Sequence, residues 1–274
     1  MSLKLVFRSI WHNPGNKGKR LHKTAAAVYW QLYKRVRKSP RLLILPNGLL
    51  FKAYPDCVVS SALIYSDWPE YQELAFIRSR LKSDSVVIDV GAYVGHISLL
   101  LADIVGWANI FAFEPTPITY ARLAENWALN GWDSDKLFPM AIGANPGGTF
   151  IPNTNYPESK NSVTMQVENG DFVPVSLASL DSLRPMWQDR HIGLLKIDVE
   201  GYEREVLQGS MELLQAERPS LIMFESLSAG VELQIVTLLR DCRYTIFQLD
   251  DKGCPDFEEQ WAQNLFAIPV ESLG

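Results

Sequence analysis

Short apolar runs alternate with stretches of helical periodicity from residue 86 onward. The predicted strands lie at residues 86–90, 110–113, 137–142, 194–199 and 221–224, and the helices between and after them at 97–105, 117–130, 202–215 and 229–241. Apolar strands separated by helices are typical of a parallel sheet that is covered on both faces. Two later runs, 244–249 and 264–268, predict a terminal antiparallel pair. The pattern therefore predicts an α/β fold with one mostly parallel sheet.

The first 83 residues follow a different pattern and predict a helical and hairpin extension to the α/β domain of residues 84–274. An amphipathic helix is predicted over 17–38, with one apolar face formed by Leu21, Ala25, Val28, Tyr29, Leu32 and Val36. The Pro46-Asn47-Gly48 turn predicts a hairpin at 42–51, and 68–82 is predicted to be helical. We expect the apolar face of the first helix to pack over the sheet, with its basic residues in solvent.

The charge of the chain is unevenly distributed. The 274 residues are 47% hydrophobic, which excludes a fully disordered chain, and their formal net charge is −5. Residues 1–55 contain twelve Lys and Arg and no acidic residue, whereas the rest of the chain holds 14 basic and 31 acidic residues. We therefore expect no nucleic-acid partner, and residues 1–41 could contact an anionic membrane surface or another anionic partner.

Cysteine content and hydropathy indicate the compartment. Cys57, Cys242 and Cys254 are too few and too scattered for a disulfide framework or a zinc cluster, which favours a reducing compartment. The N-terminus lacks the continuous apolar segment of a signal peptide, and no segment is predicted to span a membrane. We therefore expect a cytoplasmic protein, with peripheral membrane contact as an alternative for its N-terminal region.

A glycine loop follows the first predicted strand of the sheet. Asp89 lies near the end of that strand, and Gly91 and Gly95 permit the positive φ angles of a tight turn before the next helix. The loop lacks the G-x-G-x-x-G spacing that cradles a dinucleotide pyrophosphate, which argues against an NAD enzyme. A carboxylate here repels phosphate but suits the ammonium or sulfonium of S-adenosylmethionine. The alternative is an ordinary strand–turn–helix junction.

The second strand ends in another carboxylate, Glu114. An acidic residue in this place accepts hydrogen bonds from the two hydroxyls of a ribose, so Glu114 favours an adenosine ligand without specifying which one. A helix cap or a surface acid is the alternative for Glu114 alone. Because Asp89 and Glu114 lie at the ends of consecutive strands, the pair together favours a ligand site at that edge of the sheet.

Ionisable side chains also interrupt the fourth apolar strand. Lys196, Asp198 and Glu200 alternate with apolar residues, so we expect them to share one face of the strand. Three such groups on a buried strand are costly unless they are paired or functional. Their position at the carboxyl end favours a function. The alternative is an ion pair between Lys196 and Asp198 that only secures the sheet edge.

These segments resemble the FkbM-type S-adenosylmethionine-dependent methyltransferases over residues 84–227. That family carries an I-D-V-G-A-N-x-G loop, an F-E-P second strand, a helix ending in N-x-x-x-N, and the motif K-I-D-V-E-G-x-E-x-x-V-L-x-G. The corresponding residues are 88–95, 113–115, Asn126 with Asn130, and 196–209. Tyr93 stands where the family usually has Asn. The resemblance implies a Rossmann-like class I methyltransferase sheet with an antiparallel terminal strand.

The resemblance and the strand-end pattern together imply where the substrates bind. The implied S-adenosylmethionine contacts are Asp89, Gly91, Ala92, Tyr93, Gly95, Ser98, Glu114, Pro115, Asn130 and Ile142. Asp198 or Glu200 is expected to take the proton of the acceptor or to orient its hydroxyl. Lys196 is expected to pair with these carboxylates, and Glu225, at the end of the fifth strand, is a second candidate on the same rim.

The reaction implied by the resemblance is O-methylation of a sugar, a glycolipid or a secondary metabolite. The insertion at 148–180 is expected to form a lid over the acceptor, through Asn155, Tyr156, Asn161 and Ser162. Asp198, Glu200 and Glu225 could instead ligate Mg²⁺, but no separate set of metal ligands favours this. The alternative function is a non-catalytic protein that binds S-adenosylmethionine or another adenosine ligand, or a scaffold at a membrane surface.

Overall fold

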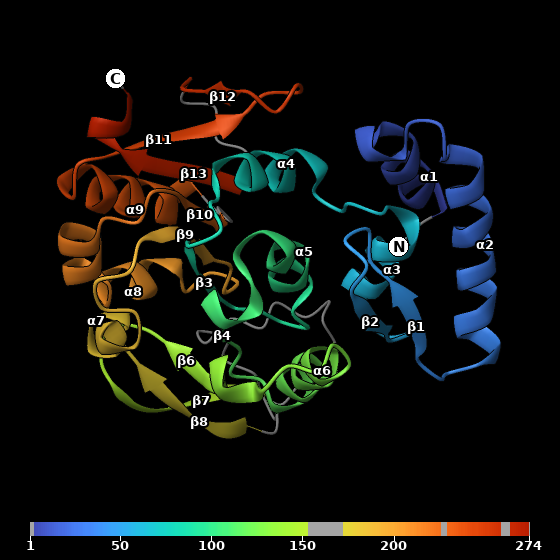
Figure 1. Ribbon diagram of the computed structural model, residues 1–274, viewed down its shortest axis with the longest axis horizontal. Coiled ribbons are helices and arrows are strands. Elements are labelled where there is room, and N and C mark those ends of the chain that lie inside the picture. Colours follow the sequence, from blue (N-terminus) through green and yellow to red (C-terminus); the bar gives the residue numbers. More distant parts are fainter. Residues whose placement is uncertain (1–2, 153–171, 226–228, 259–263, 274) are drawn as a thin grey trace.

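The computed structural model describes residues 3–152, 172–225, 229–258 and 264–273 (Figure 1). Within these residues the centre is an eight-stranded sheet with the order β12-β11-β13-β10-β9-β3-β4-β5. Its strands are β3 (Val86–Val90), β4 (Ile110–Phe113), β5 (Leu137–Phe138), β9 (Ile192–Ile197), β10 (Ile222–Glu225), β11 (Tyr244–Leu249), β12 (Pro255–Asp256) and β13 (Asn264–Pro269). β3, β4, β5, β9 and β10 pair in parallel, and β13 runs antiparallel to β10 and β11. The predicted Rossmann-like sheet is confirmed.

Two apolar clusters cover the two faces of this sheet. The domain's helices in the first cluster are α4 (Tyr71–Arg80), α5 (His96–Val105) and α6 (Pro117–Ala128), and those in the second are α7 (Leu180–Leu183), α8 (Glu203–Gln208) and α9 (Ala229–Asp241). Successive residues of β3 alternate between the clusters, with Val87 in the first and Val86 and Ile88 in the second. Burial on both faces explains why the strands are continuous apolar runs in the sequence.

The predicted third strand, residues 137–142, is divided between two sheets. β5 stays in the central sheet, and β6 (Met140–Ile142) joins β7 (Gly147–Pro152) and β8 (Phe172–Ala178) in a three-stranded sheet. Pro139 lies at the break, and since proline has no N–H to donate, it interrupts the ladder. β7 and β8 confirm the hairpin in the insertion. The expected lid residues, which are Asn155, Tyr156, Asn161 and Ser162, lie outside the described residues.

The predicted helix over 202–215 is also divided. α8 ends at Gln208, and a π-helical turn follows at Leu213–Glu217. A Cβ on Gly209 would lie 2.3 Å from the carbonyl oxygen of Gly143, so the backbone passes too close to Gly143 for any side chain. A tertiary contact that helical periodicity does not show therefore requires glycine at the residue where α8 ends.

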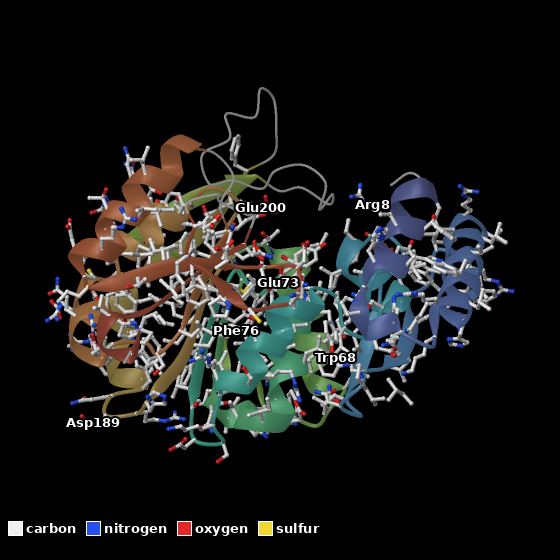
Figure 2. The ribbon with its side chains drawn as sticks, turned by 90° about the horizontal axis from the view of Figure 1, so that it is seen from above. Arg8, Trp68, Glu73, Phe76, Asp189 and Glu200 are labelled. Atoms are coloured by element: carbon white, nitrogen blue, oxygen red, sulfur yellow. The ribbon has the colours of Figure 1, made fainter. Side chains whose placement is uncertain are left out.

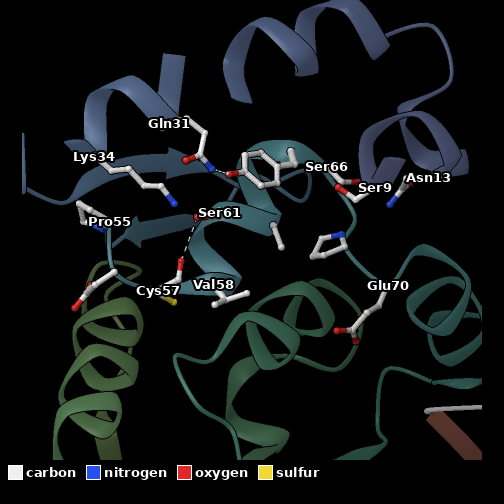
Figure 3. Close-up of a pocket in the computed structure, with 14 residues that line it drawn as sticks. Ser9, Asn13, Gln31, Lys34, Pro55, Cys57, Val58, Ser61, Ser66 and Glu70 are labelled. Carbon is white, nitrogen blue, oxygen red and sulfur yellow. Dashed lines mark hydrogen bonds between the residues drawn. The ribbon is translucent and has the colours of Figure 1, made fainter. Parts of the chain in front are cut away.

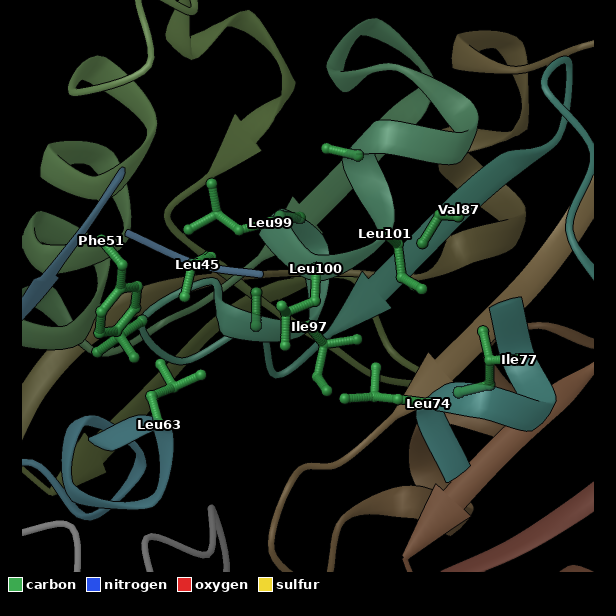
Figure 4. Close-up of a cluster of buried hydrophobic side chains, with 14 of the residues drawn as sticks. Leu45, Phe51, Leu63, Leu74, Ile77, Val87, Ile97, Leu99, Leu100 and Leu101 are labelled. Carbon is green, nitrogen blue, oxygen red and sulfur yellow. The ribbon is translucent and has the colours of Figure 1, made fainter. Parts of the chain in front are cut away.

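Residues before α4 form the predicted extension, at the right of Figure 1. Its elements are α1 (Leu3–His12), α2 (Arg20–Val36), the antiparallel strands β1 (Arg41–Ile44) and β2 (Leu50–Ala53), and α3 (Val58–Tyr65). The predicted α2 and hairpin are confirmed, whereas α1 and α3 were not predicted. Leu45, Phe51 and Leu63 of the extension lie in the same apolar cluster as Ile97 and Leu99 of α5 (Figure 4). The extension therefore shares the core of the domain.

The expected orientation of α2 is wrong. The helix buries Lys23, Ala27 and Trp30, and Nε1 of Trp30 donates a hydrogen bond to Oγ of Ser61 on α3 (3.0 Å). Lys23 forms an ion pair with Asp67. The large indole and its polar contact thus set the inner face of α2. The outer face is the apolar stripe that was expected to be buried, here called the α2 stripe: Leu21, Ala25, Val28, Tyr29, Leu32 and Val36.

Two carboxamides at the end of α6 attach the hairpin to the domain. Oδ1 of Asn126 accepts a hydrogen bond from the N–H of Lys52 (2.7 Å), and Oδ1 of Asn130 accepts one from the N–H of Leu50 (2.8 Å). Nδ2 of Asn130 also donates to the carbonyl of Leu50 (2.9 Å), so this amide pairs with β2 as a neighbouring strand would. This corrects the expected role of Asn130, whose amide binds β2 and does not line the cavity described next.

Candidate functional site

A cavity of about 380 Å³ opens at the carboxyl ends of β3, β4, β9 and β10. β3 and β9 are neighbours in the sheet, but the connections that leave them lead to helices on opposite faces. Ligands of such sheets bind in the crevice that opens between two such strands. In Figure 2, Glu200 lies at this edge and Asp189, which precedes β9, lies at the opposite edge. The cavity is called the first cavity below.

The structure brings most of the predicted site residues to the first cavity. The predicted residues that line it are Gly91, Tyr93, Glu114, Pro115, Ile142, Asp198, Glu200 and Glu225. Those outside the lining are Asp89, Ala92, Gly95, Ser98, Asn130 and Lys196. Of these, Asp89, Ser98 and Lys196 are buried directly behind the residues that line the cavity, and their hydrogen bonds and ion pairs are described below.

The loop after β3 uses backbone angles that few residues adopt. Gly91 has a φ of 77°, and a Cβ there would lie 1.9 Å from the carbonyl oxygen of Asp198. Tyr93 has a φ of 54°, a left-handed conformation that Asn adopts more readily than Tyr. The preference for Asn at this position is thus explained by the backbone, and the loop keeps the same turn with Tyr93.

The carboxylate of Glu114 is held in place at the end of β4. Oε1 accepts hydrogen bonds from the N–H of Thr116 (2.9 Å) and from Oγ1 of Thr119 (2.7 Å), and Oε2 accepts one from the N–H of Tyr93 (2.9 Å). Burial raises the pKa of Glu114, and these donors oppose the rise. Because a carboxylate has about four acceptor positions and three are used, Glu114 can still accept one hydrogen bond from a ligand in the cavity.

Asp89 lies beneath the cavity wall rather than on it. Its side chain is completely buried, Oδ2 accepts a hydrogen bond from Oγ of Ser98 (2.7 Å), and Oδ1 lies 3.2 Å from Nζ of Lys196. The expected contact of Asp89 with a ligand ammonium is therefore corrected, because the ammonium beside it belongs to Lys196. Asp89 and Ser98 instead tie β3 to the first turn of α5.

Lys196 connects two strands and the glycine loop. It lies opposite Asp89 in the parallel pairing of β9 with β3, and its Nζ is also 3.3 Å from Oδ2 of Asp198 and 3.3 Å from the carbonyl oxygen of Gly91. Burial opposes the charge of Lys196, but the carboxylates of Asp89 and Asp198 outweigh it and raise the pKa of the ammonium. The predicted pairing of Lys196 with Asp198 is present, and it positions Asp198 at the cavity.

Three further carboxylates meet where β9 and β10 end. Oxygens of Asp198, Glu200 and Glu225 lie within 4.8 Å of one another. Glu200 has a φ of 56° and Gly201 one of 99°, so a left-handed turn follows β9. The spacing is one at which a cation could be held, and the ammonium of Lys196 already supplies positive charge at Asp198. The structure thus brings together the carboxylates proposed for the acceptor.

Glu203, a buried residue to which the sequence analysis assigned no role, supports this turn. Its Oε1 accepts hydrogen bonds from the N–H groups of Val199 and Gly201, both at 3.1 Å. Burial raises the pKa of Glu203, and the hydrogen bonds from the turn oppose the rise. Glu203, the second glutamate of the K-I-D-V-E-G-x-E motif, therefore holds the backbone turn that carries Glu200, the first glutamate.

His96, at the start of α5, lines the first cavity and is buried. Within the described part of the chain its Nδ1 has no hydrogen-bond partner. Burial and the charge of Lys196 lower the pKa of His96 to about 4, so its imidazole is neutral near pH 7. A neutral ring nitrogen with free hydrogen-bonding capacity can bind a ligand, and no sequence motif assigned this role to His96.

The extension also contributes to the first cavity. Val58 and Val59 of α3 line it, together with Glu70, which precedes α4. Glu70 is exposed at the cavity by its surface area, but many protein atoms surround its carboxylate, and this partial desolvation, with the charge of Asp198, raises its pKa to about 7. No local pattern marks these residues, because only the packing of the extension brings them to the carboxyl edge of the sheet.

Known proteins are similar in sequence to this domain. A family profile described as "Methyltransferase FkbM domain" matches residues 89–246, more than half of the chain. Methyltransferase sdnD of Sordaria araneosa is 31% identical over 208 residues, which cover 65% of this chain and 80% of that one. Hexuronic acid methyltransferase AglP of Haloferax volcanii is 29% identical over 174 residues, which cover 62% of this chain and 67% of that one.

A solved structure, methyltransferase FkbM from Methylobacillus flagellatus KT, aligns with this chain at a TM-score of 0.49 and 15% identity. The alignment covers 76% of this chain and 53% of that chain. The profile match is the finding that assigns the chain, and it includes both the glycine loop at Gly91 and the strand that carries Lys196 and Asp198. This chain therefore belongs to the FkbM methyltransferase family.

Proposed function

We propose that this protein transfers the methyl group of S-adenosylmethionine to a hydroxyl group of a sugar, a glycolipid or a secondary metabolite. The observation that carries the proposal is the first cavity, which has a buried carboxylate at the end of β4 and three carboxylates where β9 and β10 end. The family supplies the class of reaction. AglP, a hexuronic acid methyltransferase by its name, favours a sugar as the acceptor.

The residues around the first cavity fit the methyl donor. Glu114 has acceptor capacity for one ribose hydroxyl, and Nδ1 of His96 is a buried polar atom whose hydrogen-bonding capacity a ligand could use. The carboxylates at the rim suit a ligand that carries an ammonium and a sulfonium. When it is bound, S-adenosylmethionine supplies an electrophilic methyl group.

The acceptor hydroxyl has to lose its proton, and a carboxylate at hydrogen-bond distance can take it. We assign this role to Asp198 or Glu200. Lys196 holds Asp198 from behind, and Glu203 holds the turn that carries Glu200, so both carboxylates are positioned before the acceptor arrives.

Calorimetric titration with S-adenosylhomocysteine tests the donor site. Wild-type protein should bind it, and Glu114→Gln should weaken binding about ten- to a hundredfold, because the variant loses charged acceptors for the ribose. Glu258→Gln, at an exposed position that does not line the cavity, should bind as the wild type does. Unchanged affinity in Glu114→Gln would remove Glu114 from the donor site.

Turnover at saturating S-adenosylmethionine tests the acceptor side. Isotope-labelled methyl transfer into an extract of cells that lack the gene, analysed by mass spectrometry, identifies the product. At least one of Asp198→Asn and Glu200→Gln should lower turnover about a hundredfold or more. Asp189→Asn, the same change at the opposite edge of the sheet, should have no effect. Wild-type rates in both cavity variants would refute the assignment.

Two further outcomes separate the alternatives. Binding of S-adenosylhomocysteine without any methylated product would identify a non-catalytic binding protein, and no binding would favour a scaffold. We expect EDTA to leave turnover unchanged, because Lys196 already provides a positive charge beside Asp198. Loss of turnover in EDTA, restored by Mg²⁺, would instead assign the three carboxylates to a metal ion.

A further inference from the structure

A second cavity, of about 490 Å³, lies within the extension (Figure 3). Helices α1, α2 and α3 and the segments that follow β2 and α3 supply its wall. Its volume is within the range of about 300–1,000 Å³ that is typical of small-molecule sites. The extension thus forms a pocket of its own beside the site at the carboxyl edge of the sheet.

The two cavities meet at two residues. Val58 and Glu70 line both of them, and in Figure 3 both lie along the same side of the second cavity. Glu70 has a left-handed φ of 51°, so the chain turns sharply at this point before α4 begins. The two cavities therefore adjoin at Val58 and Glu70.

We propose that the second cavity binds the methyl acceptor, a saccharide, and that Glu70 holds the acceptor hydroxyl where the two cavities meet. This inference rests on the proposed function, because it takes the first cavity to be the donor site. The donor and the acceptor then occupy separate pockets, and the extension selects the acceptor.

The lining of the second cavity supports a saccharide. A sugar ring presents hydroxyls at its edge and apolar faces, and the lining combines Tyr65, Val58 and Ala62 with the amide of Gln31 and the ammonium of Lys34. Gln31 donates a hydrogen bond to the hydroxyl of Tyr65, so two polar side chains are oriented before a ligand binds. Lys34 further suits a sugar that carries a carboxylate.

A cavity-filling variant tests this assignment. Ala62→Phe narrows the second cavity and leaves the first, whose lining does not include Ala62. The probes are the methyl and 4-nitrophenyl glycosides of glucose and of glucuronic acid, with labelled S-adenosylmethionine. Wild type should methylate at least one probe, and Ala62→Phe should raise its KM about tenfold or more. The affinity of Ala62→Phe for S-adenosylhomocysteine should be unchanged.

Two variants complete this test. Ala128→Phe, at an exposed position on α6, is the matched control and should leave KM unchanged. Because Glu70 lines both cavities and its pKa is raised to about 7, Glu70→Gln should lower kcat/KM about tenfold and remove the pH dependence of kcat/KM in that range. A loss of kcat/KM with the pH profile intact would assign Glu70 a structural role only and overturn its part in the proposal.

The outcomes distinguish this inference from the proposed function. An unchanged KM in Ala62→Phe would overturn the second cavity as the acceptor site. A wild type that binds S-adenosylhomocysteine but neither binds nor methylates any probe would overturn the saccharide assignment. A wild type that does not bind S-adenosylhomocysteine would overturn the proposed function itself.

The α2 stripe carries a second, independent inference. Its large members, which are Leu21, Val28, Tyr29, Leu32 and Val36, are between 52% and 83% exposed. Single exposed apolar residues are ordinary, but a continuous stripe along one helix face indicates an interaction surface. α2 is the outermost helix of the extension in Figure 1, so this face points away from the rest of the molecule.

The charge beside the α2 stripe has one sign. Residues 1–55 contain twelve Lys and Arg and no acidic residue, and Lys17, Arg35, Arg37 and Lys38, at the two ends of α2, are exposed. A helix with one apolar face and basic flanks suits a bilayer that contains anionic lipids. Two copies of this face would bring like charges together, which disfavours a dimer through α2.

We infer that α2 lies in the interface of an anionic membrane, with the α2 stripe between the lipid headgroups. Acidic residues are absent from the first 55 positions, so nothing in this segment opposes the attraction. In the part of the chain that the structure describes, no helix combines the length and apolar character needed to cross a bilayer.

Sedimentation with vesicles tests this inference. The protein should bind vesicles of phosphatidylcholine and phosphatidylserine, and it should bind them about tenfold more weakly at high salt. Leu32→Glu should weaken this binding about tenfold or more, because it removes apolar contact and adds a repelled charge. Leu233→Glu makes the same change at an exposed position of α9 and should have little effect.

Each other result would overturn the inference. Equal binding to vesicles of pure phosphatidylcholine would exclude recognition of anionic lipid. Full binding by Leu32→Glu would place the contact elsewhere on the protein. A dimer in size-exclusion chromatography that Leu32→Glu dissociates would show that a second copy covers the α2 stripe.

Discussion

The glycine loop and the turn after β9 approach each other most closely at Gly91. There the φ is 77° and a Cβ would lie 1.9 Å from the carbonyl oxygen of Asp198. Gly131 has a similar φ of 75°, but nothing lies within 4 Å of the place its Cβ would take. These two residues therefore separate the effect of backbone strain from the effect of steric exclusion.

We predict that Gly91→Ala lowers the free energy of unfolding by about 4 kcal/mol or more, because the two loops must move apart. Gly131→Ala should lower it by only about 1–2 kcal/mol, the strain of a left-handed Ala. Urea denaturation of both variants measures the difference. Equal losses would show that the loops at Gly91 can separate at little cost.

His96 makes the stability depend on pH. Its pKa of about 4 in the folded protein lies below the ordinary 6.5, because burial and Lys196 disfavour the imidazolium. The unfolded chain binds a proton at this residue below about pH 6.5, whereas the folded protein does so only near pH 4. The stabilising effect of the neutral imidazole is therefore complete above pH 6.5 and is lost as the pH falls towards 4.

We predict that His96→Gln weakens this pH dependence. Between about pH 7.5 and about pH 5, the wild type should lose about 2 kcal/mol more of its free energy of unfolding than the variant does. Urea denaturation at the two pH values measures this, with His22→Gln at an exposed position of α2 as the control. The same pH dependence in wild type and His96→Gln would show that another group is responsible.

At the scale of elements, the end of α6 serves as a substitute strand for β2. The side chains of Asn126 and Asn130 satisfy the backbone groups of Lys52 and Leu50 that face away from β1. An edge strand with unpaired N–H and C=O groups is normally covered in some way, and here two carboxamides do so. The N-x-x-x-N motif is thus explained by the attachment of a strand.

We predict that Asn130→Leu lowers the free energy of unfolding by about 2–4 kcal/mol, because the N–H and C=O of Leu50 lose their partners. Its affinity for S-adenosylhomocysteine should stay within about twofold of the wild type, since a residue outside the first cavity makes no ligand contact. Ala121→Ser, at an exposed position on α6, is the control for stability. Normal stability with lost ligand affinity would restore Asn130 to the cofactor site.

For the whole molecule, the decisive feature is that the extension and the domain share one apolar cluster. Phe51 and Leu63 of the extension are buried in it together with Ile97 and Leu123 of the domain. Figure 4 shows residues of both parts within this cluster. Neither part can lose its partner without exposing apolar surface, so the boundary near residue 84 does not separate two independent cores.

We predict that the full chain unfolds in one cooperative transition. The ratio of the calorimetric to the van't Hoff enthalpy should be close to one, because separation of the extension would expose Phe51 and the residues packed on it. The comparison is differential scanning calorimetry of Asn130→Leu, which should show one unfolding transition at a lower temperature than the wild type. Two resolved transitions would show that the extension and the sheet fold separately.

The sequence by itself determined the sheet and the class of site. Strands that are buried on both faces must be apolar throughout, so the pattern of apolar residues predicts β3, β4, β9 and β10. Glu114 and Asp198 stand out because an ionisable group at the end of an apolar strand needs a partner or a function. Both residues line the first cavity.

Tertiary structure alone decided the partners of these groups and the direction in which α2 faces. A helical period shows that one face is apolar but not what lies against it, so the α2 stripe was assigned to the interior although Trp30 directs the opposite face inward. Likewise, Asp89 suits an ammonium, but only the register of β3 with β9 shows that the ammonium is that of Lys196. Glu70 reaches the first cavity through the packing of residues far apart in the chain, and such contacts leave no local pattern in a sequence.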